Sequence, residues 1–312
     1  MAPSSSVPAR GEEMAFIAAI TLKVGRDRDM LQAVNMMAEE HFELSVDQRK
    51  QLITAYRIDF SDKHKALRTI SVMEQQEDDP KKIECIAWYR GVLEADMQAT
   101  CSSTLDIVHN HLLPFCHDAE NATLYNKMIG DTCWYLAMLK KVEDKEPFLQ
   151  KALTAYETAS EKAKILSPAN PLRLSVHMTE TAFHYDVMKW PERAYDLAKK
   201  ALVEARPALV LLDEESYKES TVYVKLMVDN LEKWRTALGK DPEDTLSFKE
   251  LQTASSSSTG YPCPEVPPSV PAAAPDNFIN RGDWEDDVLE GLSAMEIRRR
   301  KKASMMRKGR MG

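Results

Sequence analysis

Residues 213–234 read DEESYKESTVYVKLMVDNLEKW. Six side chains in this stretch follow the spacing i, i+3, i+4, i+7, i+8 and i+11: Tyr223, Leu226, Met227, Asn230, Leu231 and Trp234. This spacing is one face of an α-helix, since 3.6 residues make a turn and the side chains three, four and seven apart gather on one side. The stretch therefore predicts an amphipathic helix over 214–237.

Helix signals recur along the chain on both sides of this stretch. Ser45 with Gln48 three residues later forms a capping box, and Asn170 before Pro171 reads as an N-cap with proline at the first helical position. The stretches between prolines are rich in good helix formers, and no convincing strand pattern occurs. We predict an all-α fold with nine helices, at about 12–24, 28–41, 45–76, 81–113, 117–141, 147–166, 171–189, 191–211 and 214–237.

The composition changes after Lys240. Ser255–Ser258 is a serine run, and six prolines fall between Pro262 and Pro275. Such a segment cannot bury enough apolar surface to offset the loss of chain entropy. We expect a disordered N-terminus over 1–11, a helical domain over 12–240, and a disordered Ser/Pro-rich tail over 241–312 that ends in a basic cluster.

Several classes of protein are excluded by what the chain lacks. Between Asp27 and Leu238 only Gly91 and Gly130 occur, which argues against nucleotide-binding α/β folds, and no GxGxxG, GxxxxGK, HExxH or GxSxG motif is present. We therefore expect no enzyme, no cofactor and no metal. The five dispersed cysteines argue against a disulfide framework and favour a reducing compartment. No signal peptide and no apolar run of the ~18–20 residues that span a bilayer is present.

Charge is unevenly placed. Residues 296–312 carry eight Arg or Lys and one Glu, a net +7, so subtracting this from the total of −8 leaves −15 on residues 1–295. An acidic body disfavours nucleic acid as a partner. Arg298–Lys302 resembles a nuclear-import signal, with Ser304 as a basophilic-kinase site, so we expect a cytoplasmic protein with the nucleus as a second location. The acidic, apolar stretch Trp284–Leu292 reads either as a short helix that forms on docking or as a solvated segment.

Three segments resemble the 14-3-3 family over roughly residues 12–237. They are Asn170–Leu174 leading through Phe183–Tyr185 to Pro191–Ala194, Asp213–Thr221 ending in Asp229–Leu231 and Trp234, and Glu43–Ser45 leading through Ala55–Arg57 to Glu74–Gln75. Lys127-Met128, Gly130-Asp131 and Tyr135–Ala137 also match. The resemblance implies nine antiparallel helices in a cup-shaped bundle, a dimer, and a groove that binds phosphoserine or phosphothreonine peptides.

The resemblance also implies a phosphate pocket, and this chain departs from it. The family holds the phosphate with a Lys, two Arg and a Tyr, which fall here on Arg57, His64, Trp134 and Tyr135. A phosphate carries nearly two negative charges, and several cationic donors are needed to hold it. A histidine with the usual pKa of ~6.5 is mostly neutral at pH 7, and tryptophan offers one N–H and no charge. We therefore expect a degenerate pocket, partly compensated by Lys127 and Arg68 and by Lys63 and Lys65 on either side of His64.

The residues that would hold the peptide itself are also only partly kept. Asn230 matches the family's backbone clamp on the last helix, and its partner on the seventh helix falls on Thr179. Asp186 stands where the family has a Glu. Leu226 matches the apolar wall of the family's groove, and the family's Trp on the last helix is retained as Trp234. Both of these apolar side chains would also suit the core of any helical bundle.

The dimer contacts implied by the resemblance are mixed. Arg26 near the start and Asp96 on the fourth helix fit one ion pair of the family. Asp29 and Tyr89 keep part of a second contact, but its Lys position is Val92. Exposed ion pairs contribute only ~0–1 kcal/mol each, so we expect dimerisation to persist, as a homodimer or with a 14-3-3 paralogue that supplies the complementary charges.

Our hypothesis is a dimeric 14-3-3-like adaptor in signalling that binds phosphorylated client proteins through a degenerate phosphate pocket. The alternative within the family is a phospho-independent scaffold or a heterodimer partner of a competent subunit. A helical-repeat scaffold is a further alternative, although no 34-residue period holds along the chain. An enzyme is the least favoured, because no nucleophile and base stand together.

Overall fold

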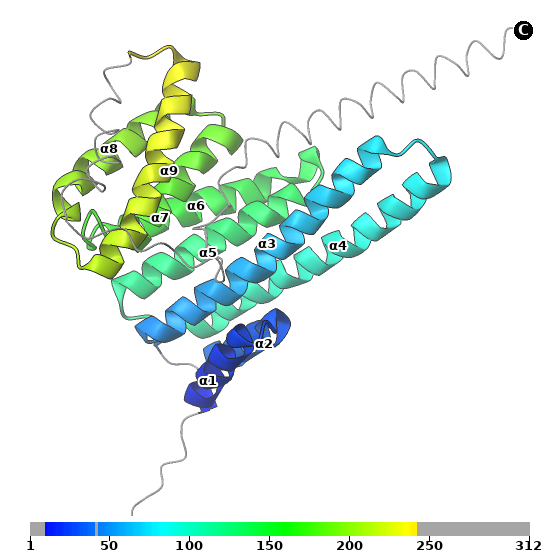
Figure 1. The fold of residues 1–312 in the computed structure, drawn as a ribbon, viewed down its shortest axis with the longest axis horizontal. Helices are drawn as coiled ribbons and strands as arrows, with labels where there is room; N and C mark the ends of the chain where they lie inside the picture. Colours follow the sequence, from blue (N-terminus) through cyan, green and yellow to red (C-terminus); the bar gives the residue numbers. More distant parts are fainter. Residues whose placement is uncertain (1–9, 41–42, 242–312) are drawn as a thin grey trace, which may run out of the picture. The chain divides into compact units, whose positions relative to one another are not determined.

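The computed structural model describes residues 10–40 and 43–241 (Figure 1). Within that part of the chain it contains nine α-helices and no strand, in agreement with the predicted fold class. None of these helices combines the length and apolar character that a bilayer-spanning segment needs. The α-helices are α1 (Arg10–Lys23), α2 (Asp27–Ala38), α3 (Val46–Gln76), α4 (Pro80–Ile107), α5 (Ala119–Met138), α6 (Glu146–Ala163), α7 (Pro171–Ala182), α8 (Pro191–Leu209) and α9 (Glu214–Leu238).

The two predicted N-terminal caps are confirmed. The Gln48 side chain accepts from the Ser45 backbone N–H at 2.9 Å, and the Gln48 N–H donates to Ser45 Oγ at 3.4 Å. At the start of α7, Asn170 Oδ1 accepts from the N–H groups of Leu172 and Arg173 at 2.9 and 3.2 Å. These bonds satisfy helix-end donors that have no partner within the helix.

Two helix ends differ from the prediction by more than three residues. The helix expected over 81–113 is α-helical to Ile107 and continues as a π turn, η1 (Val108–Leu112), and a 3-10 turn, η2 (Leu113–Phe115). The helix expected over 171–189 is α-helical to Ala182 and continues as the π turn η4 (Phe183–Val187). The second change precedes Pro191, whose ring disfavours the helical conformation for the residue before it, and Trp190 lies at φ −110°, ψ 67°.

Residues 10 and 11, expected to be disordered, belong to α1. The rest of the predicted disordered N-terminus and nearly all of the predicted tail, with Trp284–Leu292, Arg298–Lys302 and Ser304, lie outside the described residues.

The described residues group into two compact units. One comprises residues up to Phe60 together with those from Gln98 onward, and the other comprises Ser61–Met97. In the second unit the late part of α3 runs antiparallel to the early part of α4, since Glu74 pairs with Arg90 at 2.5 Å and Lys63 with Asp96 at 3.6 Å. A single helical domain over 12–240 and a cup shape stay predictions.

In the first unit α5 is largely buried, and α6 lies along it (Figure 1). A Cβ atom on Gly130 of α5 would lie 2.5 Å from Tyr156 Cε1 of α6, closer than real Cβ contacts come. The Tyr156 ring cannot yield, because it is fully buried, lies 5.2 Å from the Phe183 ring, and donates its hydroxyl to Asp131 Oδ1 at 2.8 Å. The close approach of α5 and α6 therefore requires glycine at position 130.

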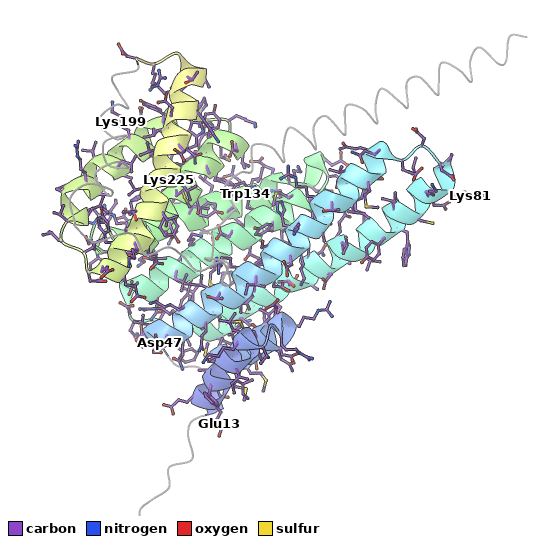
Figure 2. The ribbon with its side chains drawn as sticks, viewed as in Figure 1. Glu13, Asp47, Lys81, Trp134, Lys199 and Lys225 are labelled. Atoms are coloured by element: carbon purple, nitrogen blue, oxygen red, sulfur yellow. The ribbon has the colours of Figure 1, made fainter. Side chains whose placement is uncertain are left out.

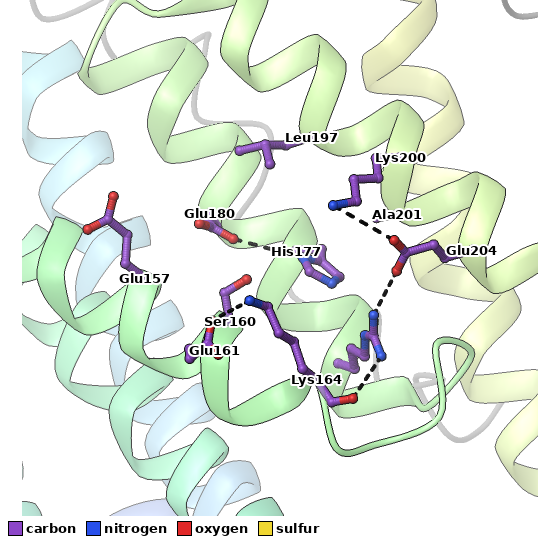
Figure 3. Close-up of a pocket in the computed structure, with 11 residues that line it drawn as sticks. Glu157, Ser160, Glu161, Lys164, His177, Glu180, Leu197, Lys200, Ala201 and Glu204 are labelled. Atoms are coloured by element: carbon purple, nitrogen blue, oxygen red, sulfur yellow. Dashed lines mark hydrogen bonds and ion pairs between the residues drawn. The ribbon is translucent and has the colours of Figure 1, made fainter.

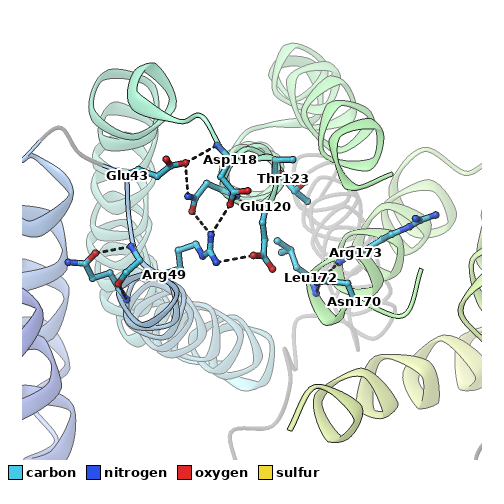
Figure 4. Close-up of polar contacts among 12 residues, drawn as sticks. Glu43, Arg49, Asp118, Glu120, Thr123, Asn170, Leu172 and Arg173 are labelled. Atoms are coloured by element: carbon cyan, nitrogen blue, oxygen red, sulfur yellow. Dashed lines mark hydrogen bonds and ion pairs between the residues drawn. The ribbon is translucent and has the colours of Figure 1, made fainter. Parts of the chain in front are cut away.

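A polar cluster joins the starts of α3 and α5 in the same unit (Figure 4). Arg49 donates to Asp118 Oδ2 at 3.0 Å, to Asn121 Oδ1 at 3.1 Å and to Glu120 Oε2 at 2.9 Å. Glu43 accepts from Asn121 Nδ2 at 3.2 Å and from the Asp118 N–H at 2.8 Å. These hydrogen bonds to Glu43 lower the pKa of its carboxyl. The cluster thus fixes the register between the first turns of the two helices.

We predict opposite effects for alanine at the two helical glycines. Gly130→Ala should destabilise the fold by about 1–3 kcal/mol, because the added methyl overlaps the immobile Tyr156 ring. Gly91→Ala should stabilise it by about 0.5–1 kcal/mol, because nothing lies within 4 Å of a Cβ there and alanine costs less entropy in a helix. Urea unfolding midpoints measure both. A Gly130→Ala variant as stable as Gly91→Ala would contradict the proposed close approach.

Candidate functional site

The first part of the candidate site lies on α5. Lys127 Nζ pairs with Asp131 Oδ2 at 2.8 Å, and the other oxygen of Asp131 accepts the Tyr156 hydroxyl at 2.8 Å. The side chains of Lys127 and Asp131 are 12 % and 20 % exposed. The lysine predicted from the sequence is therefore held in place by a carboxylate that is itself anchored to α6. Part of the lysine charge is balanced within the protein.

The second part joins α3 to α5. The ring of Phe60 stacks on that of Tyr135 with 4.8 Å between centroids and 4° between planes. Arg57 precedes Phe60 by three residues, nearly one helical turn, and is half-buried. The structure thus brings Arg57 and Tyr135 onto neighbouring helices, next to a common aromatic contact.

Trp134, labelled in Figure 2, belongs to the core rather than to an open surface. It is 4 % exposed, and its ring meets the edge of the Phe183 ring at 5.3 Å between centroids. Such edge-to-face aromatic pairs contribute roughly 0.5–1.5 kcal/mol beyond the area they bury. At a position where the resemblance implies an arginine, this chain therefore has an apolar packing contact.

His64 lies on α3 seven residues after Arg57, two turns along the same helix face. It belongs to the second unit, whereas Arg57, Lys127, Trp134 and Tyr135 belong to the first. Its place in the phosphate site stays a prediction.

The residues predicted on α7 and η4 are mostly engaged in structure. Thr179 is 3 % exposed, and its hydroxyl donates to the Ser175 carbonyl of its own helix at 3.0 Å. Asp186 is half-buried in η4. Its neighbour Tyr185 stacks on Trp234 of α9 with 4.8 Å between centroids, which fixes η4 against α9.

The last helix, α9, has two faces. Its core face consists of the buried residues Val224, Met227, Val228, Leu231 and Trp234. A half-buried stripe beside it contains Val222, Tyr223, Leu226 and Asn230. Leu226 and Asn230 are one turn apart on this stripe, where a bound segment can reach them, while Trp234 belongs to the core.

The predicted dimer residues form pairs within the single chain. Arg26 donates to Asp29 at 2.7 Å, and this contact raises the pKa of the arginine. Asp96 pairs with Lys63 in the second unit, where Tyr89 is 48 % exposed. Dimer formation through Arg26 would therefore have to compete with its existing pair.

The first helix also carries exposed apolar side chains. Phe16, Ile17 and Ile20 are 68 %, 40 % and 44 % exposed, and their spacing puts them on one side of α1, while Val24, in the turn directly after the helix, is 64 % exposed. Clustered exposed apolar side chains mark interaction surfaces more often than scattered ones do.

Sequence reasoning missed the residues that support the site. The resemblance includes Asp131 only in the Gly130-Asp131 match, although its spacing of four from Lys127 signals a helical ion pair. Tyr156, Phe60 and Phe183 carry no local signal, because their importance comes from contacts between helices distant in sequence.

The arrangement suits non-covalent binding of an anion. Arg57 and Lys127 supply cations and Tyr135 a phenol, without a nucleophile and base placed together in this group. Within residues 10–40 and 43–241 no three His, Cys, Asp or Glu side chains gather as metal ligands.

Comparison with known proteins matches residues 17–235 to the 14-3-3 protein family. The chain is 32 % identical to 14-3-3 protein 9 of Solanum lycopersicum, an alignment that covers 75 % of this chain and 91 % of that protein. It is 32 % identical to 14-3-3 protein epsilon of Drosophila melanogaster, with 75 % and 90 % covered. It is 34 % identical to a 14-3-3-like protein of Chlamydomonas reinhardtii, with 74 % and 91 % covered. The chain therefore belongs to the 14-3-3 family of non-enzymatic adaptors.

Proposed function

We propose that this protein is a dimeric adaptor that binds phosphoserine- or phosphothreonine-containing segments of client proteins with reduced phosphate affinity. Membership of the family implies phosphoprotein binding and dimerisation in general. The reduced affinity and the residues that carry it are our inference for this chain.

The observation that supports the phosphate site is the meeting of α3 and α5 at the Phe60–Tyr135 stack. It sets the Arg57 guanidinium, the Tyr135 phenol and the Lys127 ammonium on two adjoining helices. Cationic donors converging from different helices are what a phosphate with nearly two charges requires.

Two features of α5 support a reduced affinity. Lys127 shares its charge with Asp131 at 2.8 Å, so a phosphate must compete with a carboxylate already in place. Trp134 packs into the core against Phe183 and offers no charge to a ligand. A charge-assisted hydrogen bond contributes about 1.5–3 kcal/mol, so the loss of one arginine alone weakens binding by an order of magnitude or more.

The stripe on α9 supports binding of an extended peptide beside the phosphate. The Asn230 amide can donate to and accept from a peptide backbone, and Leu226 one turn earlier offers an apolar contact. Thr179, whose hydroxyl already serves the Ser175 carbonyl, contributes less to such a clamp. We expect Asp186 and Trp234 to affect peptide binding indirectly, through the positions of η4 and α9.

We propose that the exposed apolar side of α1 forms the dimer contact, together with Arg26, Asp29, Tyr89 and Asp96. Burying apolar surface stabilises by about 25 cal/mol per Å². A contact that buries more than about 40 Å² of apolar surface therefore outweighs an exposed ion pair of about 0–1 kcal/mol. The Arg26–Asp29 pair within the chain favours a partner that supplies its own charges. A heterodimer with a 14-3-3 paralogue therefore stands beside the homodimer.

The buried Trp134 and the Lys127–Asp131 pair also favour a second candidate, a phospho-independent scaffold that acts mainly as the dimer partner of a competent subunit. Under either function we expect neither nucleic acid nor membrane as a partner. We infer a cytoplasmic location, which is typical of the family, with nuclear import through the basic C-terminus.

The phosphate site is tested by charge changes on α3. Arg57→Glu should abolish binding of a fluorescent phosphoserine peptide, because it places a carboxylate where the phosphate needs a cation. His64→Arg should strengthen binding by about tenfold, the effect of roughly one added charge-assisted bond. Trp134 is left unchanged, because a charged side chain in its buried position would test stability rather than affinity.

Fluorescence anisotropy measures these affinities, with Arg28→Glu as the matched control. Arg28 is exposed on α2 and has no assigned role, so the same change of charge there should leave binding unaltered. Equal losses in Arg57→Glu and Arg28→Glu would mean that general charge, and not a site at Arg57, governs binding.

The dimer proposal is tested on α1 and at the start of α2. Phe16→Asp should shift the dimer to monomer, because it places a charge in the apolar contact, and Arg26→Glu should weaken the dimer less. Native mass spectrometry, with and without a paralogue, measures the distribution. Arg28→Glu serves as control here too. A wild-type monomer in both settings would refute the proposal.

A further inference from the structure

A pocket of about 410 Å³ lies between α6, α7 and α8, all in the first unit (Figure 3). None of the side chains that line it belongs to the proposed phosphopeptide site. Its volume falls in the range of small-ligand and side-chain pockets. Its walls carry charged side chains of both signs, so the pairing of these charges decides what the pocket can hold.

All but one of the carboxylates on the wall have a permanent cationic partner. Glu204 pairs with Arg173 at 2.7 Å, Glu157 pairs with Arg193 at 3.0 Å, and Glu161 pairs with Lys164. Arg173 also donates to the Leu166 carbonyl at 2.9 Å, which fixes the α6–α7 loop at the edge of the pocket.

Glu180 of α7 is the exception. Its side chain is 6 % exposed and lines the pocket, and among the described residues the basic side chains within 4 Å of it are two histidines of the same helical segment. His177 Nδ1 and His184 Nε2 lie 3.9 Å from its two oxygens. In the described part of the chain no lysine or arginine pairs with it.

Glu180 is nevertheless ionised at neutral pH. Burial by itself raises the pKa of its carboxyl, but its interactions with the neighbouring His177, His184 and Ser160 side chains outweigh burial and lower this pKa to about 2. His184 is fully buried, and neither of its ring nitrogens has a hydrogen-bond partner. The carboxylate therefore stays negative, and a lysine or arginine side chain that enters the pocket could form a charge-assisted hydrogen bond with it.

We propose that this pocket binds a lysine or arginine side chain of the chain's own basic segment, Arg298–Lys302, with the cation paired to Glu180. Five consecutive cations in that segment match the one carboxylate on the wall that lacks a cationic partner. The lysines and the arginine already on the wall do not oppose this, because each is paired with a glutamate.

The point at which the tail leaves the helices supports the chain itself as the source. Lys240, directly after α9, lies 3.4 Å from Asp196 of α8 and 4.2 Å from the centre of the Tyr195 ring. Lys200, one turn after Asp196 on the same face of α8, lines the pocket. The tail therefore starts beside one of the three helices that form the pocket.

The length of the tail is sufficient. Fifty-seven residues separate Lys240 from Arg298, and a flexible linker of that length would span about 40 Å on average, at about 5–6 Å times the square root of the residue number. Tethering of this kind gives an effective concentration of about millimolar. At this effective concentration, an ion pair that is too weak to bind a free peptide can still form between two parts of the same chain.

A photo-cross-linking amino acid at position 303 of the full-length protein, in place of Ala303, tests this proposal. Irradiation followed by peptide mapping should give cross-links to residues of α6, α7 or α8 around the pocket. Glu180→Gln should lower their yield about fivefold, the change in an equilibrium that corresponds to roughly 1 kcal/mol. The matched control is Glu192→Gln, which removes one exposed carboxylate of α8 that does not line the pocket.

Because Glu180 is buried, circular dichroism must first show that its variant is folded. Replacement of Arg298–Lys302 by glutamine, outside the described helices, provides an independent test and should abolish the same cross-links. Cross-links elsewhere on the protein, or a yield unchanged by neutralising the segment, would overturn the proposal. A yield that rises with protein concentration would assign the segment to a second copy and would equally overturn it.

Discussion

The contact between Gly130 and the Tyr156 ring sets how closely α5 approaches α6, and the candidate site depends on it. A Cβ at position 130 would lie 2.5 Å from that ring, so only glycine permits the approach. The same approach lets the Tyr156 hydroxyl reach Asp131, the next residue of α5, which in turn holds Lys127. A packing constraint inside the bundle therefore fixes the position of a cation that we assign to ligand binding.

The chemistry of the proposed site follows from charges that are absent or shared. Trp134 contributes to the core through Phe183, so the position supports the fold while it gives a phosphate nothing to bind. A ligand would have to share the positive charge of Lys127 with Asp131. We propose that a pocket built in this way favours clients whose flanking residues supply affinity along α9, since the phosphate supplies less of it.

Much of the fold could be predicted from the sequence, because its signals are local. The capping box at Ser45 and the cap at Asn170 predicted two helix starts. The period of α9 predicted an amphipathic helix, and three of its six periodic residues, Met227, Leu231 and Trp234, lie on the core face. The π turn after Ala182 carries no such signal, since it arises where the chain must turn into α8. The resemblance predicted which residues form the candidate site, but it did not predict that Trp134 is buried.

The most direct measurement is the affinity of the wild-type protein for one peptide with and without phosphate, by isothermal titration calorimetry at pH 7. With about one or two effective cations, we expect the phosphate to contribute about 1.5–3 kcal/mol, which is a ratio of roughly 10 to 150 in affinity. Equal affinities would contradict a phosphate site at Arg57 and Lys127. A ratio of many thousands would contradict its weakening by Trp134 and Asp131.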